Sequence, residues 1–370
     1  MSLKIRRTLF DLKTASYGKD SGKESSAPGI NLTDCSLGTN PFGHSPVVAE
    51  AISLTQKIDL SLYPTSYDDL KEAIMRRWES ITPLQRGQIV FGGGAIDIIA
   101  KTNRIFIDPG SLVLGAAPQF PDYANDVRCM GGVYQAVPFD QSAGYAFNVE
   151  RFLQAMDQRH TIVHLDNPNN PTGQCLPLES IRTITEKAAS MNICVVIDEA
   201  YGDFMDDGES AIGLVNNYEN LLVIRSFSKG LGLAGLRIGY MIASETICRY
   251  YEQAGAPFTI NSLGHQLGKL VLADEAFIRD AKEKITRLKT AVREACRHVA
   301  VLKTDDRVPI MVLEHPDEDC NLYRLFLENG IVTVTGACFE SLGKRHGRLR
   351  VPRDIDRLRT SIQEIEAGLS

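Results

Sequence analysis

The sequence predicts an α/β protein with a large domain, in which helices cover a mixed, mostly parallel sheet, and a small α+β domain. Short apolar runs alternate with segments of helical period from about Pro46 to Ala243, which is typical of a sheet covered on both faces by helices. After Gly255 the pattern changes to a long helical segment followed by short strands. The chain has 370 residues, a length that suits two domains better than one.

The individual elements follow from the same patterns. Residues 19–29 are rich in Ser, Gly and charge and are expected to form an arm or an exposed loop. A helix is expected at 177–192, a long helical segment at 262–297 and a last helix from Asp354. Strands are expected at 88–91, 111–115, 161–165, 193–198, 221–226, 238–243, 309–314, 331–335 and 347–351. We expect an arm with part of the small domain at 1–45, the large domain at 46–255 and the small domain at 256–370.

Composition argues against several classes of partner. Lys and Arg number 40 against 46 Asp and Glu, so we expect no nucleic-acid binding. No stretch approaches a membrane span and the N-terminus lacks an apolar signal region, so no membrane partner and a cytoplasmic location are expected. The cysteines lack a C-x-x-C pair and a cluster of histidines, so they are expected to be reduced, with no metal site; they are Cys35, Cys129, Cys175, Cys194, Cys248, Cys296, Cys320 and Cys338.

The strongest chemical motif is RSFSKGLGLAGLRIGY at 225–240. Lys229 follows a predicted strand, at the edge where α/β sheets present functional groups, and Arg237 follows eight residues later. Ser226, Ser228 and Arg237 offer donors suited to a dianionic phosphate. A lysine near positive charge and partly buried can lose its proton and react with a carbonyl cofactor. The alternative is a solvated loop lysine.

Three further motifs also follow predicted strands. VVIDEAYGDF at 195–204 places Asp198 at a strand end with Tyr201 after it, although a helix cap is a common alternative for such an Asp. LDNPNNPTGQ at 165–174 could hold the amide of Asn170 toward a ligand or could be only a tight turn. VFGGGAIDII at 90–99 resembles a phosphate cradle at a helix start, but it matches neither the dinucleotide fingerprint nor the P-loop.

These motifs, in this order, resemble the fold-type I pyridoxal-5′-phosphate (PLP) aminotransferases of class I and II. The likeness is greatest to the histidinol-phosphate aminotransferase group and its threonine-phosphate decarboxylase relatives, and it covers nearly the whole chain. NPNNPTG and SKGLGLAGLRIGY are highly specific as a pair. The resemblance implies that 46–255 is a PLP-binding domain and that the protein is a homodimer with shared active sites.

The resemblance also implies roles for individual residues. Lys229 would form the Schiff base with PLP, Asp198 would pair with the pyridine nitrogen, and Asn170 and Tyr201 would hydrogen-bond the ring hydroxyl. Arg350 would bind the substrate carboxylate, with Arg348 as its alternative if the register differs. The remaining implied cofactor contacts are Ser226, Ser228, Arg237 and the loop Gly94, Ala95 and Ile96 for the phosphate, Phe120 for ring stacking, and Tyr63 for the phosphate of the other subunit.

The sequence departs from the family pattern at two places. Val334 and Thr335 stand where relatives carry an Arg that binds substrate phosphate, and Ile96 stands where they often carry a polar or acidic residue. We therefore expect an unphosphorylated substrate, with Val334 and Phe339 lining its side-chain pocket.

The expected function is transamination between an amino acid, or an amino-acid-like amine, and a 2-oxo acid, in amino-acid metabolism. The same cofactor also supports decarboxylation of the threonine-phosphate decarboxylase type, and this is the alternative function. A PLP-binding regulator is disfavoured because such proteins carry an added DNA-binding domain.

Overall fold

We describe the protein from a computed structural model that covers residues 4–10, 12, 32–55, 58–64 and 66–369. The arm expected at 19–29 lies outside these residues. None of the helices in these ranges is long and apolar enough to cross a membrane.

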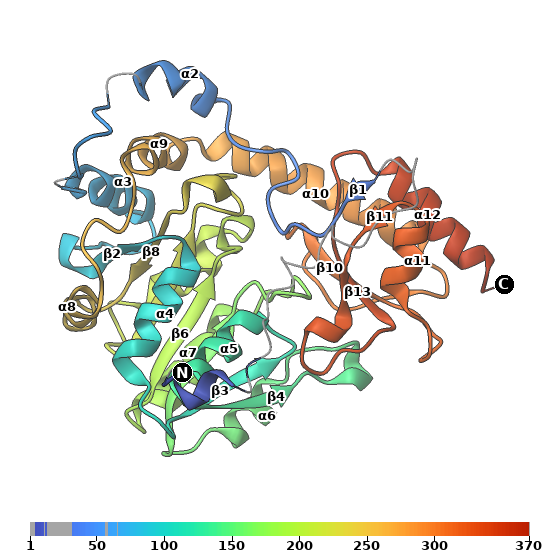
Figure 1. Cartoon of the computed structure of the whole chain (residues 1–370), viewed down its shortest axis with the longest axis horizontal. Helices are drawn as coiled ribbons and strands as arrows, with labels where there is room; N and C mark the ends of the chain where they lie inside the picture. Colours follow the sequence, from blue (N-terminus) through green and yellow to red (C-terminus); the bar gives the residue numbers. More distant parts are fainter. Residues whose placement is uncertain (1–3, 11, 13–31, 56–57, 65, 370) are drawn as a thin grey trace.

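A seven-stranded sheet forms the centre of the larger part of the molecule (Figure 1). The strand order is β2-β8-β7-β6-β5-β3-β4, and only β8 runs antiparallel to its neighbours. The expectation of a mixed, mostly parallel sheet is therefore confirmed. The strands are β2 (Ile89–Gly92), β3 (Leu112–Ala117), β4 (Val133–Pro138), β5 (His160–Asp166), β6 (Cys194–Glu199), β7 (Leu221–Ser226) and β8 (Gly239–Ile242).

Helices cover both faces of this sheet. Alternate residues of its strands point to opposite faces, so Val195 and Ile197 belong to one apolar cluster while Val196 belongs to another. The sheet is therefore buried on both sides, which explains its nearly continuous apolar runs. The helices are α2 (Val47–Thr55), α3 (Asp68–Trp78), α4 (Ala95–Phe106), α5 (Pro121–Met130), α6 (Val149–Ala155), α7 (Leu178–Ala189), α8 (Glu245–Ala254) and α9 (Ser262–Leu272).

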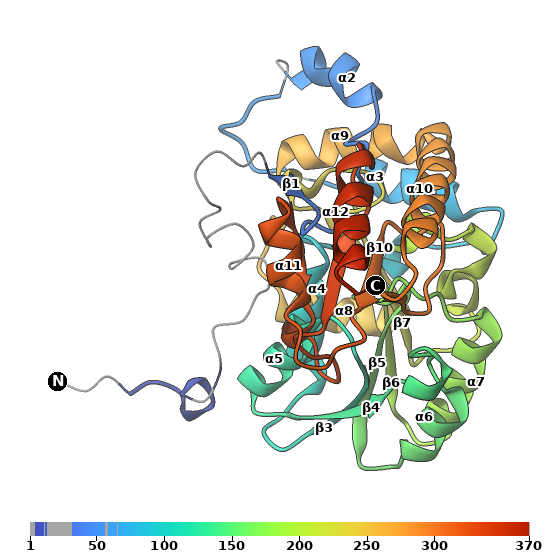
Figure 2. The same ribbon diagram turned by 90° about the vertical axis from the view of Figure 1, so that its right-hand side faces the viewer.

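The C-terminal part contains a four-stranded antiparallel sheet in the order β12-β13-β10-β9. Helices α10 and α12 lie side by side against it (Figure 2). The short strand β1 (Thr33–Asp34) pairs with β11 (Ile331–Val332), which brings residues near the N-terminus into this part. The other elements are β9 (Ala300–Val301), β10 (Ile310–Glu314), β12 (Val334–Thr335), β13 (His346–Arg350), α10 (Glu275–Ala295), α11 (Leu322–Glu328) and α12 (Asp356–Ala367).

Short 3-10 helices connect several of these elements. They are η1 (Arg7–Leu9), η2 (Arg86–Gln88), η3 (Gln141–Ala143), η4 (Gly202–Phe204), η5 (Asp207–Glu209), η6 (Ala211–Leu214), η7 (Ala234–Leu236) and η8 (Gly336–Cys338).

The structure differs from the expected elements at several places. The short strands β1 and β9 were not predicted, and the strand expected at 331–335 is two strands, β11 and β12, which pair with different neighbours. Strand β4 was not predicted, because it is an edge strand with mostly half-buried side chains and has no continuous apolar run. The helical pattern at 262–297 is two helices, α9 and α10. The side chain of Asp274 accepts a hydrogen bond from the Phe277 N–H at 3.2 Å and so caps the start of α10.

Candidate active site

The carboxyl ends of β5, β6 and β7 border a cavity of about 360 Å³. Ligands bind at this edge in open α/β sheets. The structure brings most of the predicted residues together here: Ala95, Ile96, Phe120, Asn170, Asp198, Tyr201, Ser226, Ser228, Lys229 and Arg237 line the cavity.

Lys229 lies three residues beyond Ser226, the last residue of β7. Its Nζ is 5.3 Å from the centre of the Tyr201 ring, which follows β6 and is only 3% exposed. The amine therefore lies over an aromatic wall inside the cavity.

Asp198 lies near the end of β6 and is 5% exposed. Burial raises the pKa of its carboxyl to about 6, against the lowering effects of the Ala200 N–H and of Lys229. The Ala200 N–H donates to Oδ1 at 2.9 Å. A buried carboxylate of this kind is stabilised by a cationic ligand group, and a protonated pyridine nitrogen is such a group.

An anion cradle lies at the other side of the cavity. Arg237 Nη1 donates to Ser228 Oγ at 3.5 Å, and its Nη2 donates to Gly93 O at 3.2 Å. Gly94 caps α4 with φ +88°, and a Cβ there would lie 2.6 Å from Arg237 Nη2, so only glycine fits. The N-terminus of α4, which begins at Ala95, faces the cavity beside these donors. The set suits a phosphate dianion.

Two turns at the carboxyl ends of β3 and β5 form the remaining walls. Phe120 caps the start of α5 and lines the cavity, and Asn170 is buried in the turn after β5. Asn169 Nδ2 donates to Pro118 O at 3.0 Å and so ties the two turns together. An aromatic wall and an amide are thus fixed around the same space.

The two candidate carboxylate-binding arginines lie outside the cavity lining, on β13. Arg348 is fully buried; its Nη1 donates to Ser36 O and its Nη2 to Tyr201 Oη at 3.2 Å. Arg350 Nη2 donates to Asp34 O at 2.7 Å, whereas its buried Nε has no hydrogen-bond partner among the described residues. Burial lowers the pKa of Arg350, so an arriving anion would be favourable there.

Tyr63 does not lie at this cavity within one chain. Its side chain is 72% exposed and stacks on Phe258 with ring centres 4.6 Å apart. It lines a separate cavity of about 810 Å³.

The prediction that Val334 and Phe339 line a side-chain pocket for the substrate is wrong. Both side chains are buried, 4% and 1% exposed, and neither lines the cavity, because β12 pairs with β13 inside the C-terminal sheet.

Sequence reasoning missed several lining residues. Gly38 is one of them. A Cβ at this position would lie 1.8 Å from Tyr201 Oη, so only glycine allows this approach. The glycine in the SLGTNPFG segment was the clue in the sequence. Asp166 is another; it belongs to the LDNPNNPTGQ motif but was assigned no role. The other lining residues not predicted are Leu37, Thr39, Ile99, Asp122, Pro168, Ala200 and Ala234.

Comparisons with known proteins agree with this fold. The structure matches that of a histidinol-phosphate aminotransferase from Sinorhizobium meliloti in complex with pyridoxal-5′-phosphate, with a TM-score of 0.83, 20% identity, and coverage of 100% of this chain and 99% of the other. It also matches an aspartate aminotransferase from Thermus thermophilus with maleate, with a TM-score of 0.86, 21% identity, and coverage of 99% and 100%. The fold is therefore that of the PLP-dependent transferases of fold type I.

The family follows from sequence. The model of aminotransferase class I and II matches residues 30–362, and the chain belongs to this family. A histidinol-phosphate aminotransferase of Oceanobacillus iheyensis is 31% identical over 300 residues, 80% of each chain, and that of Listeria innocua is 28% identical over 338 residues, 90% of this chain and 92% of the other. The protein is a PLP-dependent transaminase acting on small amino and oxo acids, and decarboxylation is not favoured.

Proposed function

We propose that the cavity at the ends of β5, β6 and β7 holds PLP on Lys229 and that the amino group is transferred there. One observation carries this proposal: a lysine, a buried carboxylate and an anion cradle, from three distant parts of the sequence, line the same cavity of about 360 Å³. Each of these groups matches a different part of PLP, namely its aldehyde, its pyridine nitrogen and its phosphate.

The bound cofactor would supply a conjugated ring that withdraws electrons from the substrate Cα. Asp198 would stabilise positive charge at the pyridine nitrogen, and its elevated pKa is relieved by that charge. Lys229 Nζ would accept a proton from the substrate and return it as a general base and acid. Ser226, Ser228 and Arg237 would hold the phosphate, with the N–H groups of 94–96, while Phe120 stacks on the ring.

The substrate carboxylate is proposed to bind Arg350. Two differences support this choice over Arg348. Arg348 is fully buried and both of its Nη atoms donate to protein oxygens, whereas Arg350 is only partly buried and its hydrogen bond to Asp34 O uses Nη2 alone. A guanidinium suits the task because it can bind a carboxylate through two parallel hydrogen bonds.

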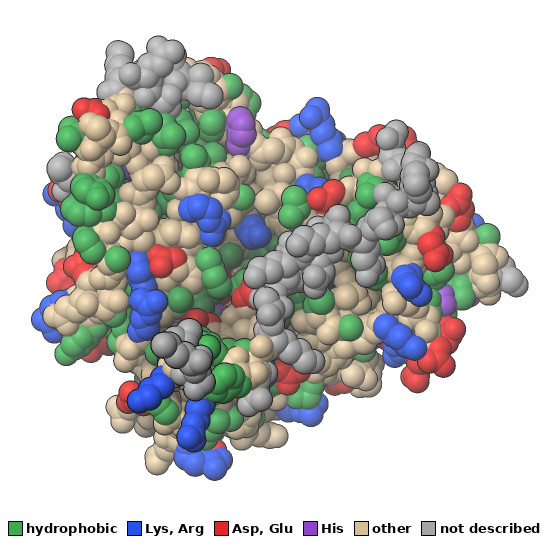
Figure 3. Space-filling view, viewed as in Figure 1, with side chains coloured by type: hydrophobic (Ala, Val, Ile, Leu, Met, Phe, Trp, Pro, Cys, Tyr) green, Lys and Arg blue, Asp and Glu red, His purple; other side chains and the backbone are tan. Residues whose placement is uncertain are grey.

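A homodimer with shared active sites is also proposed. Exposed apolar side chains gather near α2 and α9, where Figure 3 shows hydrophobic side chains at the upper left. Leu60, Leu62 and Tyr63 are 71%, 65% and 72% exposed, and Phe258 is 50% exposed. Exposed apolar groups in one area favour a protein interface, and Tyr63 would then reach the phosphate of the partner.

The domain boundaries and the cellular location are also proposed. A large and a small domain, expected at 46–255 and 256–370, are supported by separate apolar clusters around the seven-stranded sheet and around β10 and β13. Leu267 and Val271 of α9 belong to the cluster of the large sheet, however, so we propose that the boundary lies after α9. A cytoplasmic location is supported by the eight free cysteines.

The proposed function can be tested with the purified protein and added PLP. We expect visible absorbance of the bound cofactor, bleaching of that absorbance by an amino acid, and release of the matching 2-oxo acid. A panel of amino acids with product identification would name the donor. Release of CO₂ in place of an oxo acid would contradict the proposal.

A further inference from the structure

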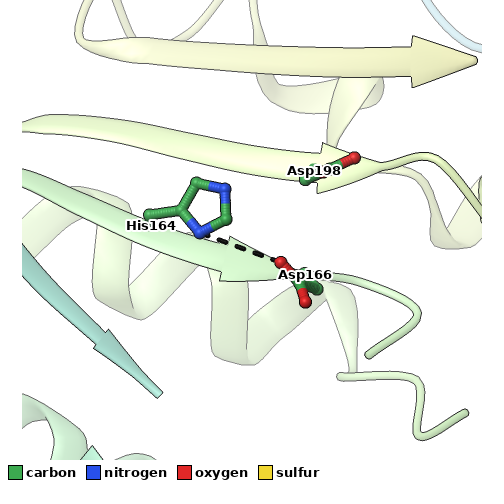
Figure 4. A group of neighbouring side chains, drawn as sticks. All are labelled: His164, Asp166 and Asp198. Carbon is green, nitrogen blue, oxygen red and sulfur yellow. Dashed lines mark ion pairs between the residues drawn. The ribbon is translucent and has the colours of Figure 1, made fainter. Parts of the chain in front are cut away.

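A second buried carboxyl lies beside Asp198. Asp166 ends β5 and pairs in register with Asp198 on the parallel strand β6, so the two side chains point to the same face (Figure 4). His164 lies two residues earlier on β5, and ligand atoms of the three side chains lie within 4.8 Å of one another. Asp166 is 5% exposed and His164 is fully buried.

The hydrogen bonds around His164 determine where its proton is. Gln119 Oε1 accepts from the Ala116 N–H at 3.1 Å, so Gln119 Nε2 must be the group that faces His164 Nδ1 at 3.1 Å. Nε2 is a donor, and Nδ1 is therefore an acceptor on a neutral ring. Burial also lowers the pKa of His164, to about 3. Because Nδ1 already accepts this bond, we interpret the group as part of the cofactor site and not as a metal centre.

The neutral histidine affects Asp166 directly. Asp166 Oδ1 lies 3.8 Å from His164 Nδ1, the contact marked in Figure 4, and it has no hydrogen-bond partner among the described residues. A neutral ring whose Nδ1 already accepts from Gln119 offers this oxygen neither a positive charge nor an N–H, so burial favours the carboxylic acid over the carboxylate. Oδ2 has a different task, because it accepts the Phe120 N–H at 2.7 Å.

The two carboxyls have unequal surroundings. Asp198 has Lys229 nearby, which lowers its pKa, whereas burial and the charge of Asp198 raise the pKa of Asp166 well above its usual value. The Phe120 and Asn170 N–H groups oppose that rise only in part. Three tyrosines also face this cluster, namely Tyr123 on α5, Tyr134 on β4 and Tyr201 after β6. Burial raises the pKa of all three, so they are neutral, and the charge of Glu199 adds to the rise in the pKa of Asp198.

We propose that Asp166 is a positioning residue that stays protonated beside Asp198, so that the one negative charge of the pair belongs to Asp198. Oδ1 would carry the proton, and Oδ2 would hold the backbone of Phe120 against the cofactor ring. The inference rests on the proposed function, since it assigns Asp198 to the pyridine nitrogen. It explains how two adjacent buried carboxyls coexist without a second cation.

Asp166→Asn is the decisive variant, because an asparagine amide mimics the neutral acid. Its Oδ1 can accept the Phe120 N–H, and its Nδ2 takes the place of the protonated oxygen. Bound PLP changes its visible absorbance with pH, and the midpoint of this change reports the charge near the ring. We expect Asp166→Asn to move the midpoint by under about 0.3 pH unit, since it removes no charge, whereas Asp198→Asn, which removes one, moves it by at least about one unit.

Affinity for PLP tests the second part of the role. Asp166→Ala leaves the Phe120 N–H without its acceptor, and we expect PLP to bind about tenfold more weakly, while Asp166→Asn stays within about threefold of wild type. A midpoint shift of about one unit in Asp166→Asn would show that Asp166 is ionised and overturn the inference. Unchanged affinity in Asp166→Ala would overturn the positioning role. Wild-type protein that takes up no PLP would instead contradict the proposed function itself.

Discussion

The two faces of strands β6 and β7 hold buried charges in opposite ways. On one face Arg225 donates to Glu199 at 3.0 Å and to Asp203 at 2.6 Å, and the other oxygen of Glu199 accepts the Ala211 N–H. On the other face Asp198, one residue before Glu199, meets the cavity with another buried carboxyl beside it.

This difference distinguishes charged groups that stabilise the fold from charged groups that serve the cavity. Arg225 and Glu199 are paired in register, so their charges are satisfied before any ligand arrives. On the cavity face the burial of Asp198 is unfavourable until a cationic group binds, which is the condition expected of a functional site.

The largest expected effect concerns Lys229. Lys229→Ala removes the group that we propose holds the cofactor and moves the proton, so we expect turnover to fall by about 10²–10⁴-fold or more. Lys344→Ala is a suitable control, because Lys344 is exposed, pairs with the exposed Asp319 and lies outside the cavity lining. Oxo-acid production by both variants would be measured, and normal transamination by Lys229→Ala would refute the assignment.

Variants of the adjacent residues Asp198 and Glu199 test most sharply whether the two faces of the sheet differ in role. Asp198→Asn should keep the fold but reduce kcat by more than about 100-fold, a barrier increase of about 2.7 kcal/mol. Glu199→Gln should instead lower the free energy of unfolding, by about 3 kcal/mol, because Arg225 loses the fully buried one of its two anionic partners and keeps only Asp203.

Both variants would be compared by denaturant unfolding and by single-turnover kinetics. Equal losses of stability and of rate in the two would show that the faces do not differ in role. An Asp198→Asn rate within about threefold of wild type, under about 0.7 kcal/mol, would exclude its catalytic role.

Substrate preference gives the next effect. The cavity lining contains Lys229 and Arg237, both assigned to the cofactor, and Asp122 adds an acidic group. A lost charge-assisted phosphate contact costs about 1.5–3 kcal/mol, so we expect kcat/KM for histidinol phosphate to be about 10- to 150-fold below that for the best unphosphorylated amino acid. A preference for histidinol phosphate would show that another cation binds its phosphate.

The smallest effect is expected from Arg350→Lys. The lysine keeps the charge but loses the planar pair of donors, so KM for the amino acid should rise about tenfold while the visible spectrum of bound PLP stays unchanged. Arg348→Lys is the informative comparison, because Arg348 contacts Tyr201 Oη and should alter the spectrum. A spectrum changed by Arg350→Lys would place Arg350 at the cofactor instead.

Local sequence was sufficient to predict the strand ends that surround the cavity. Lys229, Asp198 and Asn170 each follow an apolar run, and parallel strands bring their carboxyl ends to one edge. The role of Asp166 could not be predicted in this way, because only the register between β5 and β6 places it beside Asp198. Val334 was misplaced for a similar reason, since its pairing with β13 turns it into the interior.

The central claim is that Lys229 holds PLP, and covalent trapping tests it most directly. The PLP-loaded protein would be reduced with borohydride, digested and analysed by peptide mass spectrometry. We predict a phosphopyridoxyl group on the peptide that contains Lys229 and on no other lysine at comparable yield. Stable labelling of a different lysine, or no labelling of a protein that transaminates, would contradict the account.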